Sequence, residues 1–94
     1  MKTANIKKAS ECIKTMGHPV RLSVLSLLSQ KERNVQNLTK VLRISQSNLS
    51  QHLSKMRQKK IVTTRRNGNM IYYGVRNPKV LKLMALMMEI FCEN

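Results

Sequence analysis

Residues 37–60 read NLTKVLRISQSNLSQHLSKMRQKK, and this stretch decides how the chain is interpreted. Two short helical patterns are joined there by a tight turn, and the second is rich in small polar side chains and precedes a basic flank. This layout is typical of a helix-turn-helix, whose second helix enters the major groove of DNA. Residues 33–88 contain no Asp or Glu, which phosphate would repel. We therefore predict a DNA-binding surface on the second helix.

The size and charge of the chain narrow the class of protein. Its 94 residues are enough for one small domain, residues 1–94, with 41% hydrophobic residues for a modest core. The net charge of +14 indicates a polyanionic partner, nucleic acid first and an anionic membrane surface second. Two Tyr and one Phe are the only aromatic residues, which argues against stacking of single-stranded bases.

The chain shows no pattern for export or membrane insertion. Its first residues, MKTANIKKASECIK, lack an unbroken apolar stretch. The most apolar segment, residues 80–92, is shorter than a membrane span and is interrupted by Lys82 and Glu89. Cys12 and Cys92 are expected to be thiols at rest. The cytoplasm is therefore the expected location, with no membrane partner.

Local patterns predict five helices and one hairpin. Apolar residues at spacings of three and four, together with helix-starting prolines, predict helices over residues 4–16, 19–30, 35–41, 46–59 and 78–92. The β-branched and aromatic runs at 61–66 and 70–75 flank Asn67-Gly68-Asn69, a strong hairpin signal, whereas residues 31–34 are expected to be a polar connection. The predicted fold is mainly α with a small β-hairpin, a winged helix-turn-helix.

The last predicted helix is apolar on nearly every side, from Val80 to Phe91. A helix without a polar face must be covered all round. A chain this short has little left to cover it, since small domains bury only about 60–65% of their unfolded surface. We therefore expect a second copy of the chain to pack on this helix.

Three segments follow a pattern known from one group of repressors. Residues 16–28 read MGHPVRLSVLSLL, residues 44–62 read ISQSNLSQHLSKMRQKKIV, and residues 65–83 read RRNGNMIYYGVRNPKVLKL. They resemble, respectively, the second helix, the recognition helix, and the wing with the closing helix of the ArsR family of bacterial and archaeal repressors. The resemblance implies a cytosolic homodimer, joined through its first and last helices, that binds an imperfect palindrome in double-stranded DNA and releases it when an effector binds.

The residues expected to face DNA form two groups. Side chains near the start of the recognition helix reach base edges, whereas cationic and wing side chains contact phosphate, which sets orientation and affinity rather than sequence. The base-facing group comprises Gln46, Ser47, Asn48, Ser50 and Gln51, and the phosphate-facing group comprises Lys55, Arg57, Lys59, Lys60, Arg65, Arg66 and Asn69. His52 has two interpretations: contact with phosphate, or partial packing behind the base-facing group.

The sequence leaves other functions open. The charge also fits a weakly specific architectural DNA-binding protein, or simply a solubilising surface, and the apolar last helix also fits a module regulated by a protein partner. A specific repressor should prefer its palindrome by about a thousandfold over random duplex. If the dimer neutralises about eight phosphates, log K should fall with log salt at a slope of about −7. The partner module should be monomeric alone.

The effector is not identified by the sequence. The family's known metal sites use Cys-x-Cys before the recognition helix, or His and Asp along the last helix. Residues 35–42 contain no Cys or His, and residues 78–94 contain no His or Asp. We therefore expect no metal, apart from a linear two-thiolate site for a soft metal, and no cofactor. With no nucleophile–base–acid set, we expect no catalytic residue and no enzyme.

The two cysteines invite a redox interpretation. The resemblance implies a second branch of the family that senses oxidised or persulfidated thiols, using one Cys in the second helix and another near the end of the last helix. Cys92 matches the latter position, but Ser26 stands at the former, so Cys12 would be the partner in a thiol switch. The alternative is that both cysteines are small buried hydrophobic side chains.

Overall fold

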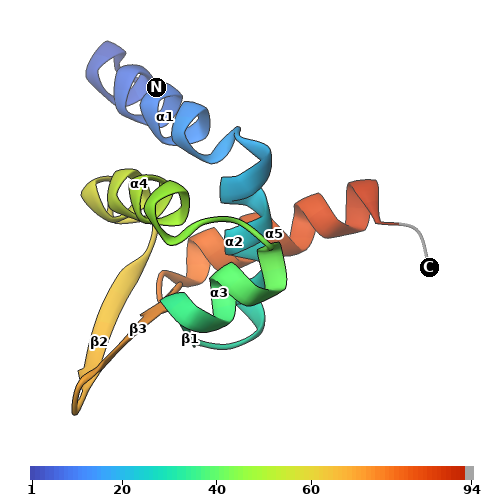
Figure 1. Cartoon of the computed structure of the whole chain (residues 1–94). Coiled ribbons are helices and arrows are strands. Elements are labelled where there is room, and N and C mark those ends of the chain that lie inside the picture. Colours follow the sequence, from blue (N-terminus) through green and yellow to red (C-terminus); the bar gives the residue numbers. More distant parts are fainter. Residues whose placement is uncertain (93–94) are drawn as a thin grey trace.

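The computed structural model describes residues 1–92, which form five helices and a small sheet (Figure 1). In chain order the elements are α1 (Thr3–Met16), α2 (Pro19–Gln30), β1 (Arg33–Asn34), α3 (Val35–Leu42), α4 (Gln46–Gln58), β2 (Thr63–Asn67), β3 (Met70–Gly74) and α5 (Pro78–Phe91). The predicted order of helices and hairpin is confirmed. Each helix end lies within one residue of its predicted position.

The turn between α3 and α4 is closed by two local features. Arg43 adopts the left-handed conformation, with φ 57°, and its N–H bonds to the carbonyl of Thr39 at the end of α3. Ser45 Oγ then accepts the N–H of Asn48 at 3.1 Å, which satisfies an amide that has no partner within α4. These contacts produce the short, sharp connection that a helix-turn-helix requires.

The sheet has three strands in the order β1-β3-β2, one more than predicted. Arg33 and Asn34 pair antiparallel with Tyr73 and Tyr72, so the expected polar connection at residues 31–34 is partly a strand. A two-residue strand is too short to show any periodicity, which explains the error. β2 begins at Thr63, two residues later than predicted. The two residues before it, Ile61 and Val62, are buried in the core.

The core lies between α2, α3 and α4. Its fully buried side chains are Leu25, Leu38, Leu49, Leu53, Met56, Val24 and Val62. Three of these, Leu49, Leu53 and Met56, form the inner face of α4, as their spacing predicted. Because this face is anchored in the core, the opposite face of the same helix is directed to solvent.

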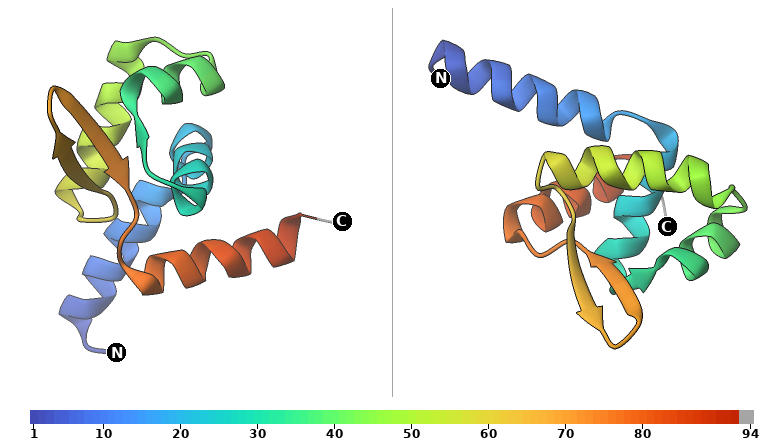
Figure 2. Two further views of the ribbon diagram at one scale, coloured as in Figure 1. Left: turned by 90° about the horizontal axis from the view of Figure 1, so that it is seen from below. Right: turned by 60° about the vertical axis from the view of Figure 1, so that its left-hand side comes forward.

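Two apolar surfaces are not covered by the chain itself. On α5 only Met84 is buried, whereas Ile90 and Phe91 are 65% and 72% exposed. On α1, Ile6 and Ile13 are 53% and 66% exposed. Figure 2 shows both helices extending from the body of the molecule. Within residues 1–92 no helix has the length and apolar character needed to cross a bilayer.

Candidate nucleic-acid interface

The outer face of α4 is polar and uncharged near its start. The five side chains predicted to face bases are all exposed, namely Gln46, Ser47, Asn48, Ser50 and Gln51. Further along the helix, Ser50, Gln51 and Ser54 line a shallow depression with Lys55 and Gln58. Hydroxyl and amide groups of this kind can donate to and accept from base edges in the major groove. This surface, formed by Gln46, Ser47, Asn48, Ser50, Gln51 and Ser54, is called the polar face of α4 below.

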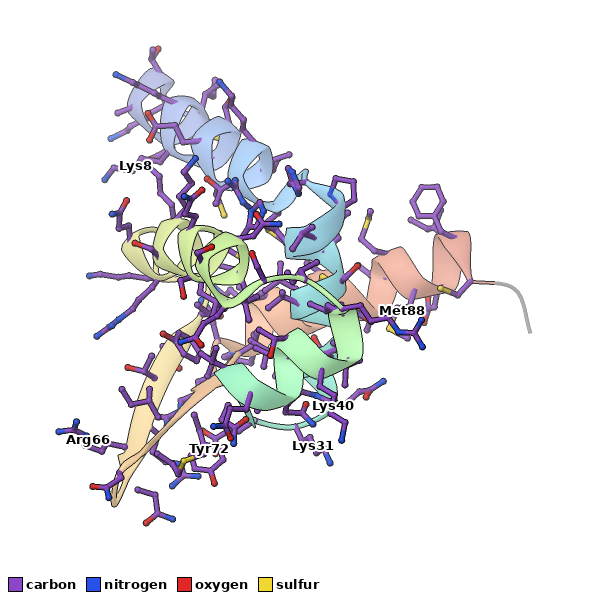
Figure 3. The ribbon with its side chains drawn as sticks, viewed as in Figure 1. Lys8, Lys31, Lys40, Arg66, Tyr72 and Met88 are labelled. Carbon is purple, nitrogen blue, oxygen red and sulfur yellow. The ribbon has the colours of Figure 1, made fainter. Side chains whose placement is uncertain are left out.

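Cationic side chains flank the polar face on the last turns of α4 and on the wing, the hairpin of β2 and β3. These exposed cations are Lys55, Arg57, Lys59, Lys60, Arg65 and Arg66, and the polar Asn69 is exposed with them on the wing. Arg66 lies toward the tip of the wing, far from the helical body (Figure 3). The predicted phosphate-facing residues are therefore at the surface, although two of them are already engaged with acidic side chains.

Lys59 is tied to α1. Its Nζ donates to Glu11 Oε2 at 3.0 Å. This hydrogen bond, with the charge of Lys59, holds the pKa of Glu11 below its ordinary value of 4.5. Both side chains are exposed, so the pair contributes little to stability. It does place α1 beside the C-terminal end of α4.

Glu32 binds the base of the wing. Its Oε1 accepts from Arg65 Nε at 3.0 Å and its Oε2 from Arg76 Nη2 at 3.4 Å, and Arg65 also lies 5.0 Å from the ring centre of Tyr72. The hydrogen bond from Arg65 holds the pKa of Glu32 below its ordinary value. Gly74 leaves the space for this arrangement, because a Cβ there would lie 3.1 Å from Glu32 Cγ. Glu32 thus fixes the orientation of the Arg65 side chain.

His52 lies half-buried on the side of α4 that faces α2. Arg21 Nε donates to His52 Nδ1 at 3.0 Å, and the ring of His18 is 4.5 Å away, tilted by 44°. Burial, followed by the charges of His18, Arg21 and Lys55, lowers the pKa of His52. Of the two interpretations from sequence, this geometry corresponds to packing beside the polar face. His18 also accepts the N–H of Val20 and so caps α2.

Sequence reasoning assigned no role to Glu32 or Arg21. Their partners are 33 and 31 residues away along the chain, so no local spacing marks the contacts. One signal was present for Glu32: it is the last acidic residue before the acid-free span of residues 33–88, and so the last carboxylate that precedes the wing in sequence. Arg21 carried no signal beyond its place in residues 16–28, the segment that resembles the second helix of the family.

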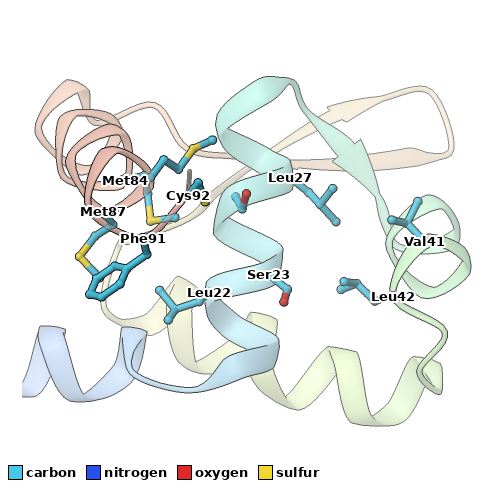
Figure 4. A pocket seen from close by; sticks show the side chains of 11 residues that line it. Leu22, Ser23, Leu27, Val41, Leu42, Met84, Met87, Phe91 and Cys92 are labelled. Carbon is cyan, nitrogen blue, oxygen red and sulfur yellow. The ribbon is translucent and has the colours of Figure 1, made fainter. Parts of the chain in front are cut away.

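The structure places the two cysteines in different surroundings. Cys92 is exposed and lines a groove of about 700 Å³ between α2, α3 and α5, with Ser26, Leu27 and Phe91 (Figure 4). Cys12 is half-buried, packs against the core and does not line this groove. Both are free thiols. Among residues 1–92 no three His, Cys, Asp or Glu side chains lie close enough together to hold a metal ion.

A helix-turn-helix with an antiparallel wing, an uncharged polar face and flanking cations defines a winged helix-turn-helix DNA-binding protein. Comparison with known proteins identifies the family. Residues 18–64 match the bacterial regulatory proteins of the arsR family. The chain belongs to the ArsR family of DNA-binding transcriptional regulators.

Individual relatives extend this similarity to the whole length of the chain. The transcriptional repressor PagR of Bacillus anthracis is 39% identical over 84 residues, 88% of this chain and 84% of PagR. HlyU from Vibrio cholerae N16961 has a TM-score of 0.91 at 32% identity, over 99% of this chain and 100% of HlyU. The transcriptional repressor BigR from Xylella fastidiosa has a TM-score of 0.83 at 34% identity, over 100% of both chains. The likeness therefore includes α1, the wing and α5, beyond the family match.

Proposed function

We propose that the chain is a cytoplasmic, homodimeric repressor that binds an imperfect palindrome in promoter DNA and releases it when an effector binds. The observation that carries this proposal is the polar face of α4, bounded by exposed cations in a span, residues 33–88, without any acidic residue. The names of PagR and BigR, both repressors, support repression rather than activation.

The uncovered apolar surfaces support a dimer. Side chains such as Phe91 on α5 and Ile13 on α1 gain about 1.5–3 kcal/mol each when fully buried. In the proposed dimer a two-fold axis passes between these helices, and the two copies of α4 would have to reach successive major grooves, about 34–36 Å apart, to bind the half-sites of a palindrome. The proposal therefore needs both surfaces, with α1 and α5 joining the subunits and α4 reading the DNA.

Within each subunit the proposed contacts divide by chemistry. The amides of Asn48 and Gln51 can pair bidentately with adenine, so the operator is expected to contain A·T pairs at the positions they reach. Lys55 and Arg66 are proposed to contact phosphate, one from α4 and one from the wing. Phosphate contacts determine affinity and its dependence on salt, whereas the amide contacts determine sequence preference.

Fluorescence anisotropy with the protein's own upstream DNA and a scrambled duplex of equal length tests the proposal. Preference for the upstream DNA by about a thousandfold supports a specific repressor. Equal affinity for both duplexes supports instead the weakly specific architectural protein that the charge of +14 also fits. A chain that is monomeric in solution and binds neither duplex supports the module regulated by a protein partner.

Thiol oxidation or persulfidation is one candidate for the effector signal. The hypothesis of thiol switching uses Cys92, which is exposed at the end of α5, with Cys12 on α1 as its partner. HlyU of V. cholerae, a relative of this chain, has also been solved in a reduced form. Repeating the titration with reduced and persulfide-treated protein tests the hypothesis. If persulfide treatment releases the DNA as fully from Cys92→Ser as from the wild type, Cys92 is not part of the switch. If treatment does not change DNA binding by the wild type, the effector must be sought elsewhere.

A further inference from the structure

A single guanidinium joins three helices next to the polar face of α4. Arg21, in the first turns of α2, donates from Nη1 to the carbonyl of Thr15 near the end of α1, at 3.0 Å. The same side chain donates from Nε to His52 Nδ1 on α4, also at 3.0 Å. Both hydrogen bonds are partly buried. The planar guanidinium thus holds the end of α1 and the middle of α4 in one fixed relation.

This contact determines where His52 carries its proton. Because Nδ1 accepts a hydrogen bond from Arg21, it has no proton, and a neutral imidazole must then carry its proton on Nε2. Within residues 1–92 every fully buried side-chain nitrogen or oxygen has a hydrogen-bond partner. Nε2 of His52 makes no hydrogen bond in that part of the chain, so it keeps some contact with solvent and is available as a donor.

We propose that Arg21 is a positioning residue for operator recognition: it holds His52 neutral with an unpaired, solvent-contacting Nε2–H donor within the described residues, and it fixes α4 relative to the interface helix α1. The inference rests on the proposed function, since it assumes that α4 reads DNA and that α1 helps to join the subunits. Arg21 itself need not touch DNA. Its effect is exerted through His52 and through the orientation of α4.

The groups around His52 make the arrangement sensitive to its protonation. Those that face it are His18 from the start of α2, Arg21 from α2 and Lys55 from α4 itself, and each is cationic or becomes so on protonation. A proton on Nδ1 would remove the acceptor for Arg21 and place a positive charge against the guanidinium. The positioning should therefore be present in the neutral form of His52 and lost as the pH falls through its lowered pKa.

The first test uses the unmodified protein. Nitrogen-15 NMR of the imidazole rings, which distinguishes protonated from unprotonated ring nitrogens, should show His52 as the Nε2–H tautomer at neutral pH. The His52 ring should also titrate with a pKa below the ordinary histidine range. His18→Asn is the control for assignment, because Asn can still cap α2 but does not titrate. An Nδ1–H tautomer, or an unshifted titration, would overturn the inference whether or not the chain binds an operator.

The second test uses Arg21→Gln, with Lys14→Gln on α1 as a control that removes the same charge from an exposed site. Arg21→Gln should reduce the preference for operator over random duplex by about tenfold, consistent with loss of a charge-assisted hydrogen bond. It should also raise the pKa of His52, because one of the cations that lowers it is gone. Lys14→Gln should change neither quantity.

The pH profile of binding separates positioning from simple structural support. In the His18→Asn variant, where His52 is the remaining histidine, the operator preference should decline on acidification. Adding His52→Gln to that variant should make the preference lower but independent of pH between about 5 and 7, where His is the residue that titrates. A profile that His52→Gln does not flatten, or an Arg21→Gln variant with undiminished preference, would contradict the proposed role. Failure of all variants and of the wild type to prefer any operator would instead refute the proposed function. If Arg21→Gln does not fold, the NMR test on the wild type decides.

Discussion

Truncation of Phe91 to Ala should weaken self-association of the chain. Phe91 is 72% exposed at the end of α5, on the surface that we propose is buried between subunits. Complete burial of a large apolar side chain contributes about 1.5–3 kcal/mol, so covering the exposed part of Phe91 contributes about 2 kcal/mol per subunit. A two-fold interface contains the residue twice, giving about 4 kcal/mol per dimer.

A loss of this size raises the dimer dissociation constant roughly a thousandfold, since about 1.4 kcal/mol corresponds to tenfold. Sedimentation equilibrium over a wide range of protein concentration measures the constant directly. The control is Ile71→Ala, because Ile71 is also apolar and 43% exposed but lies on the wing. We expect no change in the dimer constant for this variant.

Two results would refute the reasoning about α5. One is a wild-type chain that remains monomeric at all concentrations, which would leave the apolar surface to another partner. The other is a Phe91→Ala variant that dimerises as tightly as the wild type while retaining its melting temperature, which would move the interface away from the end of α5. Because Phe91 packs on little within its own chain, the variant should remain folded.

Four further predictions concern the cap, the DNA surface and the wing. Ser45→Ala should lower the free energy of unfolding by about 1 kcal/mol, measured by urea denaturation, because α4 loses its N-cap. Gln51→Ala should weaken operator binding by about 1–3 kcal/mol and leave random duplex unaffected. Lys55→Ala should weaken binding to both duplexes and make the salt slope, expected near −7 for the wild type, shallower by about one. Glu32→Gln should melt below the wild type at neutral pH, and the difference should shrink as acidification through the lowered pKa of Glu32 protonates the wild-type carboxylate.

Each of these four predictions has a result that would contradict it. An unchanged unfolding free energy would mean that water replaces Ser45 at the start of α4. Equal losses on both duplexes for Gln51→Ala would assign that residue to phosphate rather than to a base. A salt slope shallower than about −2 would contradict contact with several phosphates. A constant difference in melting temperature down to acidic pH would mean that the charge of Glu32 does not stabilise the wing.

The helices and the hairpin could be predicted because their signals are local. Pro19 and Pro78 open helices, apolar side chains recur at helical spacing, and Asn67-Gly68 provides the left-handed turn residue, with Gly68 at φ 61°. The polar face of α4 followed from the same periodicity, because the buried positions of a helix determine which positions face outward.

The contacts that organise the candidate site could not be predicted in this way. β1 is two residues long and depends on pairing with β3, far along the chain. The hydrogen bonds of Arg21 with His52 and of Glu32 with Arg65 join segments more than 30 residues apart, and nothing in the spacing of either partner reveals them. Long-range pairing of charged and polar side chains depends on the tertiary fold, which local patterns do not encode.

Sequence-specific binding by two copies of α4 is tested most directly by a hydroxyl-radical footprint on the DNA upstream of the gene. We expect two protected patches with centres about one helical turn apart, roughly 10–10.5 base pairs, on a sequence with approximate two-fold symmetry. Protection spread evenly along the duplex would contradict specific recognition. A single protected patch would contradict binding by a symmetric dimer.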